Sequence, residues 1–360
     1  MVIKKLEEDN IKLIEKFGAN PISSIENLPE FYTFNNNLFY SHRDFDKFLR
    51  RLNNGEESAI VSGFNASGTI HLGHKAVFDT NLFFQQKYDV KIFIPISDDE
   101  SYVANKVETQ KEAFENSLNL VKELIAYGFD PKKTFFIIDQ VYTDIYNYAI
   151  MLSKRIIFST IKATYGYNEV TNLGLMFYPT IQSAHILFPQ LEFEIKNVLV
   201  PIGPDEDVHL RICRDLASKF KLVKPATIHA KFMPGLDGAK MSKSKNNCFY
   251  FKDDEKTLLK KTNKSLSGGR DTLEEHKKLG GVVEKDLACY YLEKYFLSKE
   301  ESEKINLEYK KGNLLSKDVK KKLFDELIKL TSKFQKNLEN VNLKDCENSI
   351  LKNKNRKKLF

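Results

Sequence analysis

The sequence contains no tryptophan, an absence that by itself excludes no function. It also has no apolar run near the roughly 18 residues that a membrane-spanning helix needs. The segment from Met1 to Glu8 lacks the apolar core of a signal peptide. We therefore expect no membrane partner and a cytoplasmic location.

Cysteine is scarce. Cys213, Cys248, Cys289 and Cys346 are widely separated and form no Cys-x-x-Cys pair. This spacing excludes a disulfide framework and a cysteine zinc site as working hypotheses. We expect four small core or surface residues and no protein-bound metal.

The remaining composition is typical of a globular enzyme. With 360 residues, of which 42% are hydrophobic, the chain can bury a large core and form two or three domains. The formal net charge of +7 allows a polyanionic partner such as a nucleic acid but does not require one.

Short apolar runs alternate with helical periods in the first two thirds of the chain. We expect strands at 59–62, 90–94, 134–138, 198–200 and 226–228, and helices at 44–52, 73–87, 108–127, 145–164, 172–188 and 207–220. This alternation predicts a Rossmann-like α/β domain with a parallel sheet. After about Asp253 helical periods dominate, with a capping box at Thr272 and Glu275, so we expect a C-terminal all-helical domain.

The segment from Ser62 to His74 lies where a predicted strand gives way to a helix. Such a junction offers free backbone N–H groups and the positive end of a helix dipole to an anion. His71 and His74 are three residues apart, so their side chains share one face of a turn and could donate hydrogen bonds to a phosphate. Gly73 between them would let an adenine ring pack on the backbone. Two unrelated histidines or a metal pair are the alternatives.

A second segment, Lys240-Met241-Ser242-Lys243-Ser244, follows the flexible sequence Pro234-Gly235-Leu236-Asp237-Gly238. Lys240 and Lys243 would bring two ammonium charges to the β- and γ-phosphates of a nucleotide, and the serines would add small donors. In a lysine-rich chain, a solvated turn is the alternative.

In this order and separation, the two segments resemble the paired signatures of class I aminoacyl-tRNA synthetases. A wider set of segments resembles the tryptophanyl-tRNA synthetases of the archaeal and eukaryotic branch, from about residue 10 to residue 339. These segments are His42–Asp44, Ser62–His74, Ser97–Glu100, Tyr178–Ala184, Pro201–Arg211, Lys240–Ser244 and Ser267–His276.

The resemblance implies a two-step reaction. The carboxylate of L-tryptophan attacks the α-phosphorus of ATP, pyrophosphate leaves, and tryptophan is transferred to tRNA(Trp). It implies ATP as substrate, Mg²⁺ bound through the nucleotide phosphates, and a homodimer. Its catalytic residues would be His71, His74, Lys240 and Lys243, and its ATP-binding residues Ser67, Gly68, Gly73, Asp205, Met241, Ser242 and Ser244.

Three further residues are implied to bind the amino acid. Glu100 and Gln182 would hold its α-amino and carboxylate ends, and Glu206 would lie near the ammonium group. The chain departs from the family pattern at Glu206, where a glutamine is expected, at Ala66 in place of proline, and at His185, where related enzymes often carry aspartate.

The predicted domains are an N-terminal helical extension (1–57), a Rossmann-like catalytic domain for ATP and the amino acid (58–252), a helical anticodon-binding domain (253–342) and a basic tail (343–360) that frays from Lys352. The helical domain carries lysines that could contact tRNA phosphates, Lys310, Lys311, Lys317, Lys320, Lys321 and Lys322. Three alternatives stay open: a tyrosyl-tRNA synthetase, a small nucleotidylyltransferase, and an inactive RNA-binding paralogue.

Overall fold

The structure is a computed structural model that describes residues 13–354. Residues 1–12 of the predicted N-terminal extension and residues 355–360 of the predicted tail lie outside the described part. The chain forms two compact units. Unit 1 contains the residues up to Tyr40, Ile70–Thr80 and Ala230–Glu339, and unit 2 contains Ser41–Thr69, Asn81–His229 and the residues from Asn340 onward.

A largely parallel β-sheet forms the centre of unit 2. Its strands follow the order β2-β8-β7-β3-β5-β4, with β6 also paired to β5. Ile60 on β3 lies opposite Ile92 on β5 and Leu199 on β7, both in parallel register. The strands of the chain are β1 (Asn20–Pro21), β2 (Phe39–Arg43), β3 (Ser58–Val61), β4 (Phe64–Asn65), β5 (Lys91–Ser97), β6 (Thr134–Ile138), β7 (Asn197–Ile202) and β8 (Ala226–Ala230).

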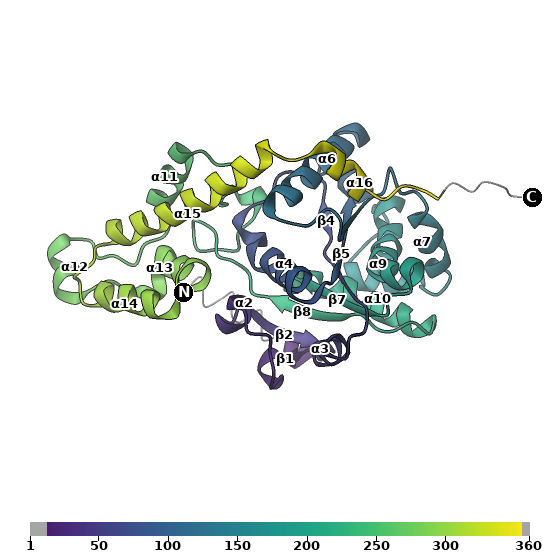
Figure 1. The fold of residues 1–360 in the computed structure, drawn as a ribbon, viewed down its shortest axis with the longest axis horizontal. Coiled ribbons are helices and arrows are strands. Elements are labelled where there is room, and N and C mark those ends of the chain that lie inside the picture. Colours follow the sequence, from purple (N-terminus) through teal and green to yellow (C-terminus); the bar gives the residue numbers. More distant parts are fainter. Residues whose placement is uncertain (1–12, 355–360) are drawn as a thin grey trace, which may run out of the picture. The chain divides into compact units, whose positions relative to one another are not determined.

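Helices cover both faces of this sheet, which explains why its strands are apolar on both sides. Figure 1 shows the sheet between α6 on one side and α7, α9 and α10 on the other. The helices of unit 2 are α3 (Phe45–Asn53), α5 (Asp98–Val103), α6 (Gln110–Tyr127), α7 (Ile145–Ser153), α8 (Phe158–Tyr165), α9 (Leu173–Phe193), α10 (Asp207–Lys219) and α16 (Leu343–Ser349). The prediction of a Rossmann-like α/β fold is confirmed.

Three sequence-based expectations differ from the observed elements. The helix predicted at 145–164 is two helices, because Ile157 is extended (φ −106°, ψ 151°) and interrupts the helical hydrogen bonds between α7 and α8. The helix predicted at 172–188 continues to Phe193, through Pro179 and Pro189. The N-terminal extension, predicted as helical, also contains β1 and β2, and β2 has the partly alternating burial of a sheet strand.

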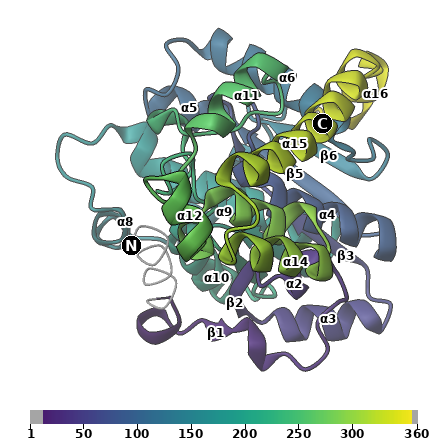
Figure 2. The same cartoon turned by 90° about the vertical axis from the view of Figure 1, so that its left-hand side faces the viewer.

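Unit 1 is mainly helical. Its longest helix, α15, contacts α11, α13 and α14. Figure 2 shows α11, α14 and α15. The helices are α2 (Tyr32–Asn35), α11 (Glu255–Lys264), α12 (Leu273–Leu279), α13 (Leu287–Tyr291), α14 (Lys299–Lys310) and α15 (Ser316–Glu339), while α4 (Lys75–Tyr88) begins in unit 1 and ends in unit 2. The predicted helical character of the C-terminal part is confirmed. Among the described residues, no helix is long and apolar enough to cross a membrane.

The segment after Glu339 belongs to unit 2. The helix α16 contacts α6 and β6, and the N–H of Leu351 donates to the carbonyl oxygen of Phe136 at 2.9 Å. The amide of Asn353 donates to Thr143 Oγ1 at 2.7 Å. The expectation of a frayed end is therefore wrong for residues 352–354, because these hydrogen bonds hold the segment against the edge of the sheet.

Candidate functional site

The two predicted histidines lie on a tight turn in unit 1, just before α4. A 3₁₀ turn, η2 (Leu72–His74), connects them. The Nδ1 atom of His71 accepts the N–H of Gly73 at 3.2 Å, and the Nδ1 atom of His74 accepts the N–H of His71 at 3.1 Å. Because each Nδ1 accepts a hydrogen bond, each neutral ring carries its proton on Nε2. The turn therefore presents two N–H donors of defined position.

The electrostatic surroundings keep both rings neutral. Burial, together with the charge of Lys243, lowers the pKa of His71 to about 4. Burial, His71 and Lys243 hold the pKa of His74 well below its usual range. At neutral pH the two imidazoles are therefore uncharged hydrogen-bond donors.

Gly73 is required by the packing of this turn. A Cβ atom at residue 73 would lie 2.8 Å from Cε1 of His71 and 3.4 Å from Sδ of Met241. The ring of His71 thus fills space beside the backbone where we expected room for an adenine ring. The proposed role of Gly73 in binding ATP stays a prediction.

The lysine segment lies in the same unit as the histidines. Met241 is buried, and Lys243 begins a second 3₁₀ turn, η4 (Lys243–Lys245). The ammonium group of Lys240 lies 3.9 Å from the centre of the Phe232 ring, and the hydroxyls of Ser242 and Ser244 are 2.9 Å apart. The proximity of Lys243 to His71 and His74 is expressed in the lowered pKa values of both rings.

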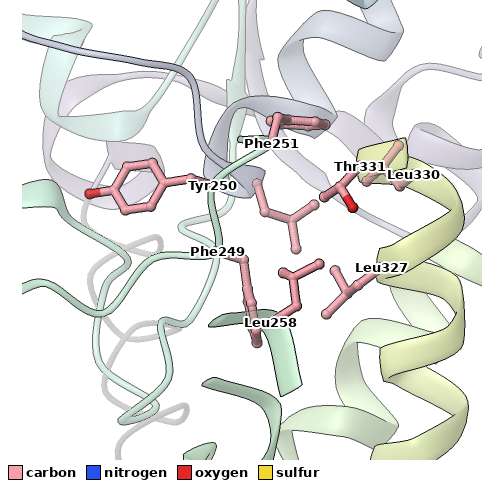
Figure 3. Close-up of a pocket in the computed structure, with 8 residues that line it drawn as sticks. Phe249, Tyr250, Phe251, Leu258, Leu327, Leu330 and Thr331 are labelled. Atoms are coloured by element: carbon pink, nitrogen blue, oxygen red, sulfur yellow. The ribbon is translucent and has the colours of Figure 1, made fainter. Parts of the chain in front are cut away.

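The residues that follow the lysine segment bind the histidine turn directly. The N–H of Leu72 donates to the carbonyl oxygen of Phe249 at 2.9 Å, and His71 pairs with Tyr250 in an antiparallel bridge. A small pocket beneath them is almost entirely apolar (Figure 3). Its lining residues are Leu72, Phe249, Tyr250, Phe251, Leu258 of α11, and Leu327, Leu330 and Thr331 of α15. This pocket packs the turn against the helices and offers no charged group to a phosphate.

Unit 2 holds the residues predicted to bind the amino acid. Glu100, on α5, accepts hydrogen bonds from the amide of Asn65 and from Lys106, whose Nζ lies 2.7 Å from Oε1. The hydroxyl of Ser101 donates to Asn65 Oδ1 at 2.8 Å. Asn65 and Lys106 therefore fix the direction of the Glu100 carboxylate, and neither was predicted as a site residue.

The structure brings Gln182 and Glu206 together. Gln182 Nε2 donates to Glu206 Oε2 at 3.3 Å. The Oε1 atom of Gln182 is buried and has no hydrogen-bond partner among residues 13–354. His209 lies nearby, with Nδ1 2.7 Å from the hydroxyl of Tyr165. Burial lowers the pKa of His209 to about 4, although the charges of Glu100 and Asp205 oppose the shift. Tyr165 and Tyr167 stack with ring centres 5.2 Å apart.

The remaining predicted residues of unit 2 lie on a turn and in a loop. Asp205 lies on the exposed turn η3 (Pro204–Glu206), and Ser67 and Gly68 lie in the loop that follows β4. Gly68 has a φ of 132°, which favours glycine. No hydrogen bond among the described residues joins Asp205 to Ser67 or Gly68 in the structure, and their roles toward ATP stay predictions.

A buried acidic group surrounds His185. The carboxylate oxygens of Asp98, Asp99 and Asp139 lie within 4.8 Å of one another, and His185 Nε2 is 2.7 Å from Asp139 Oδ1. Burial raises the pKa of all three acids, that of Asp99 to about 8, and lowers that of His185 to about 4. Protons therefore offset the charge of this group at neutral pH. The expectation of no protein-bound metal stays a prediction.

A second network fixes the start of α10, next to Glu206. The buried carboxylate of Asp207 accepts from Arg43 at 2.8 and 2.9 Å and lies 3.0 Å from His229 Nε2. Despite burial, these partners hold the pKa of Asp207 well below its usual range. Ser41 joins the same network through His229. Asp207 and His229 were not predicted as site residues, although the segment His42–Asp44, which contains their partner Arg43, was a sequence signal for this network.

The lysines predicted to contact tRNA differ in their surroundings. Lys320 donates to the carbonyl oxygens of Asn263 and Ser265 at 2.9 and 2.7 Å and thus caps the end of α11. Ion pairs join Lys310 to Glu284, Lys311 to Glu308, and Lys322 to Glu326. Lys317 and Lys321 are exposed on α15.

Comparison with known proteins assigns the chain to a family. The family model of the tRNA synthetases class I (W and Y) matches residues 53–332. The tryptophan–tRNA ligase of Methanocaldococcus jannaschii is 39% identical over 336 residues, covering 89% of this chain and 89% of the relative. That of Methanopyrus kandleri is 34% identical and covers 93% and 92%.

Solved structures agree with this assignment. The tryptophanyl-tRNA synthetase of Aeropyrum pernix superimposes with a TM-score of 0.87 at 29% identity, covering 96% of this chain and 97% of that one. The enzyme of Plasmodium falciparum gives a TM-score of 0.86 at 29% identity, covering 94% and 96%. The resemblance that the sequence segments indicated is confirmed: the chain belongs to the class I tRNA synthetases of the tryptophan and tyrosine (W and Y) family.

Proposed function

We propose that this protein is a tryptophan–tRNA ligase, which activates L-tryptophan with ATP and then transfers it to tRNA(Trp). The names of its relatives, at 33–39% identity over most of the chain, support this substrate. The observation that carries the chemistry is the convergence, within unit 1, of two neutral histidines and Lys243.

The reaction needs positioning and charge stabilisation, and no protein nucleophile. The tryptophan carboxylate attacks the α-phosphorus while the bond to pyrophosphate breaks. We propose that the Nε2–H groups of His71 and His74 donate hydrogen bonds to phosphate oxygens. The ammonium groups of Lys240 and Lys243 would bind the departing pyrophosphate. A preorganised donor of this kind contributes about 3–4 kcal/mol to transition-state stabilisation. Mg²⁺ would enter with the nucleotide, bound through its phosphates.

For the amino acid we assign three groups of unit 2. The Glu100 carboxylate, held by Asn65 and Lys106, would accept from the α-ammonium group. The buried, unpartnered Oε1 atom of Gln182 is a second acceptor, and Glu206 next to it supplies a negative charge that suits an ammonium group.

We further propose a homodimer in the cytoplasm, with residues 253–342 as the anticodon-binding domain, residues 58–252 as the catalytic domain, and residues 1–57 and 343–360 as extensions. Lys317 and Lys321, exposed on α15, are the lysines best placed to contact tRNA phosphates, because Lys320 is engaged by two carbonyl groups.

Amino-acid-dependent exchange between ATP and labelled pyrophosphate tests the proposed function. We expect exchange with tryptophan and at most weak exchange with tyrosine. Exchange with tyrosine alone would mean that this protein is specific for tyrosine, as other members of the family are. No exchange with any amino acid, together with retained tRNA binding, would identify an inactive RNA-binding paralogue.

A further inference from the structure

The lysine segment belongs to a closed loop in unit 1. Pro234 and Lys240 pair in an antiparallel bridge, and the N–H of Met241 donates to the carbonyl oxygen of Met233 at 2.9 Å. Gly235 N–H donates to Ala239 at 2.6 Å and closes the tip. Backbone hydrogen bonds thus hold the side of the loop that precedes the two serines.

A single buried side chain braces the other side of this loop. Asn247, 5% exposed, accepts the N–H of Ser242 on Oδ1 at 2.8 Å. Its Nδ2 donates to Asp237 Oδ1 at 2.7 Å and to the carbonyl oxygen of Lys240 at 3.2 Å. The amide therefore connects the tip of the loop, the first lysine and the residue that precedes the second lysine.

The amide of Asn247 occupies space that is open only because residue 235 is a glycine. A Cβ atom at Gly235 would lie 2.4 Å from both Cγ and Nδ2 of Asn247, so any larger residue would displace the amide. The N–H of Leu236 donates to the carbonyl oxygen of Asn247 at 2.9 Å, which holds the backbone at the same point. Glycine at 235 is thus explained by the close approach of Asn247.

We propose that Asn247 is a positioning residue for adenylate formation, which holds Lys240 and Lys243 in the arrangement that binds the departing pyrophosphate. This inference rests on the proposed function of the two lysines. The task needs an amide, because the same side chain must accept from Ser242 and donate to Asp237 and Lys240. Asn247 itself touches no reacting atom.

The first test is Asn247→Asp in the full-length protein. The carboxylate still accepts from Ser242 but no longer donates, and it faces the carboxylate of Asp237. We expect kcat of tryptophan-dependent pyrophosphate exchange to fall about tenfold or more, while KM for tryptophan stays within about twofold. The matched control is Asn246→Asp, which adds the same charge at the exposed neighbouring residue and should leave kcat unchanged.

Exchanging the two partners tests the hydrogen bond itself. In the double variant Asp237→Asn/Asn247→Asp, the new amide at 237 donates to the carboxylate at 247. The carbonyl oxygen of Lys240 still lacks its donor in this variant, so we expect kcat to recover only in part, to a value above that of Asn247→Asp. Asp237→Asn alone keeps an acceptor oxygen and should have little effect. A double variant no more active than Asn247→Asp would overturn the proposal.

Limited trypsin digestion gives a readout that does not depend on catalysis. Mass spectrometry should detect faster cleavage after Lys240, Lys243 or Lys245 in Asn247→Asp than in the Asn246→Asp control, and slower cleavage again in the double variant. Equal cleavage rates in Asn247→Asp and Asn246→Asp would contradict the positioning role. If the wild-type protein lacked exchange with tryptophan, the proposed function would fail, while the digestion would still show whether Asn247 holds the loop.

Discussion

The two histidines show how local hydrogen bonds define chemistry at the scale of single residues. Each Nδ1 atom accepts a backbone N–H within the same turn, so the proton of each neutral ring lies on Nε2. Burial and Lys243 lower both pKa values, so each ring donates to a phosphate in its neutral form. The backbone turn thus selects the tautomer of each ring, while burial and Lys243 keep both rings uncharged.

We predict two effects of Lys243→Ala. The activation free energy of adenylate formation should rise by about 2–4 kcal/mol, because transition-state stabilisation is lost, while tryptophan affinity should change little. Pre-steady-state kinetics measures both quantities. The pKa of His71 should rise above about 4, because the charge of Lys243 contributes to lowering it. NMR titration of the imidazole signals measures this shift. Loss of tryptophan binding with an unchanged chemical step would contradict the assignment of the loop.

The buried acids predict a pH dependence of stability. The folded-state pKa of Asp99, about 8, lies above its ordinary value of 3.8, so the folded state binds more protons between these values. The stability contributed by Asp99 is therefore lost as the pH rises toward 8. As the pH rises from 6 to 8, the free energy of unfolding of Asp99→Asn should increase by about 2 kcal/mol relative to that of the wild type, as measured by urea unfolding. The exposed Asp215→Asn is the control, and a constant difference would refute the prediction.

The residues that the sequence predicted are those with recognisable local patterns. His71, His74 and the lysine segment lie in short contiguous motifs, so the order of the amino acids alone indicates their chemistry. Asn65, whose amide binds Glu100 across 35 positions of the chain, carried no local signal. Asn247 follows the lysine segment closely, yet only the fold shows that its amide is buried against Gly235.

At the scale of elements, α15 connects the helical part of unit 1 with the histidine turn. Leu327 and Leu330 of this helix share an apolar pocket with Leu72 and Phe249 (Figure 3). The amide of Gln335, further along α15, donates to the carbonyl oxygens of Phe251 and Asp253 at 3.1 Å. Apolar packing and hydrogen bonds therefore fix α15 against the segment that follows the lysines.

We predict that Leu327→Ala destabilises the protein by about 2–5 kcal/mol, because the side chain is buried and its loss leaves a cavity. Chemical denaturation measures this change. Leu307→Ala on α14, where the side chain is 51% exposed, is the matched control and should change the free energy of unfolding by less than about 0.5 kcal/mol. Equal effects of the two variants would contradict the packing role of α15.

Helix periodicity predicted most elements, and its errors have physical causes. Residues 145–164 keep an apolar period throughout, and only the extended backbone at Ile157 separates α7 from α8. The proline-containing helix α9 was predicted too short, although its buried residues extend from Tyr178 to Gln190. Tertiary burial outweighed the local cost of proline in α9.

At the scale of the whole molecule, unit 2 exposes a group of large apolar side chains. Ile157 and Phe158 lie at the start of α8, Val170 lies in the following loop, and Leu173 begins α9, which contacts α8. Val170 is 91% and Leu173 82% exposed. We propose that these exposed apolar side chains lie in the interface of the proposed homodimer.

We predict that Phe158→Glu yields a monomer if the proposed dimer forms through this surface, because the variant would place a charge in a desolvated interface. Size-exclusion chromatography with light scattering over a range of concentrations measures the mass of the particle. Leu343→Glu on α16 changes a similarly exposed apolar residue outside this group and should leave the mass unchanged. A wild-type monomer at all concentrations would refute the proposal.

The stacked pair Tyr165–Tyr167 lies beside His209 in a chain that has 16 tyrosines and no indole of its own. Every indole signal from the protein in complex with L-tryptophan would therefore come from the ligand. Excitation at wavelengths that only indole absorbs would report binding without any background from the polypeptide. Excitation of tyrosine would in turn sensitise the emission of a nearby ligand, so substrate arrival becomes visible in the unmodified protein.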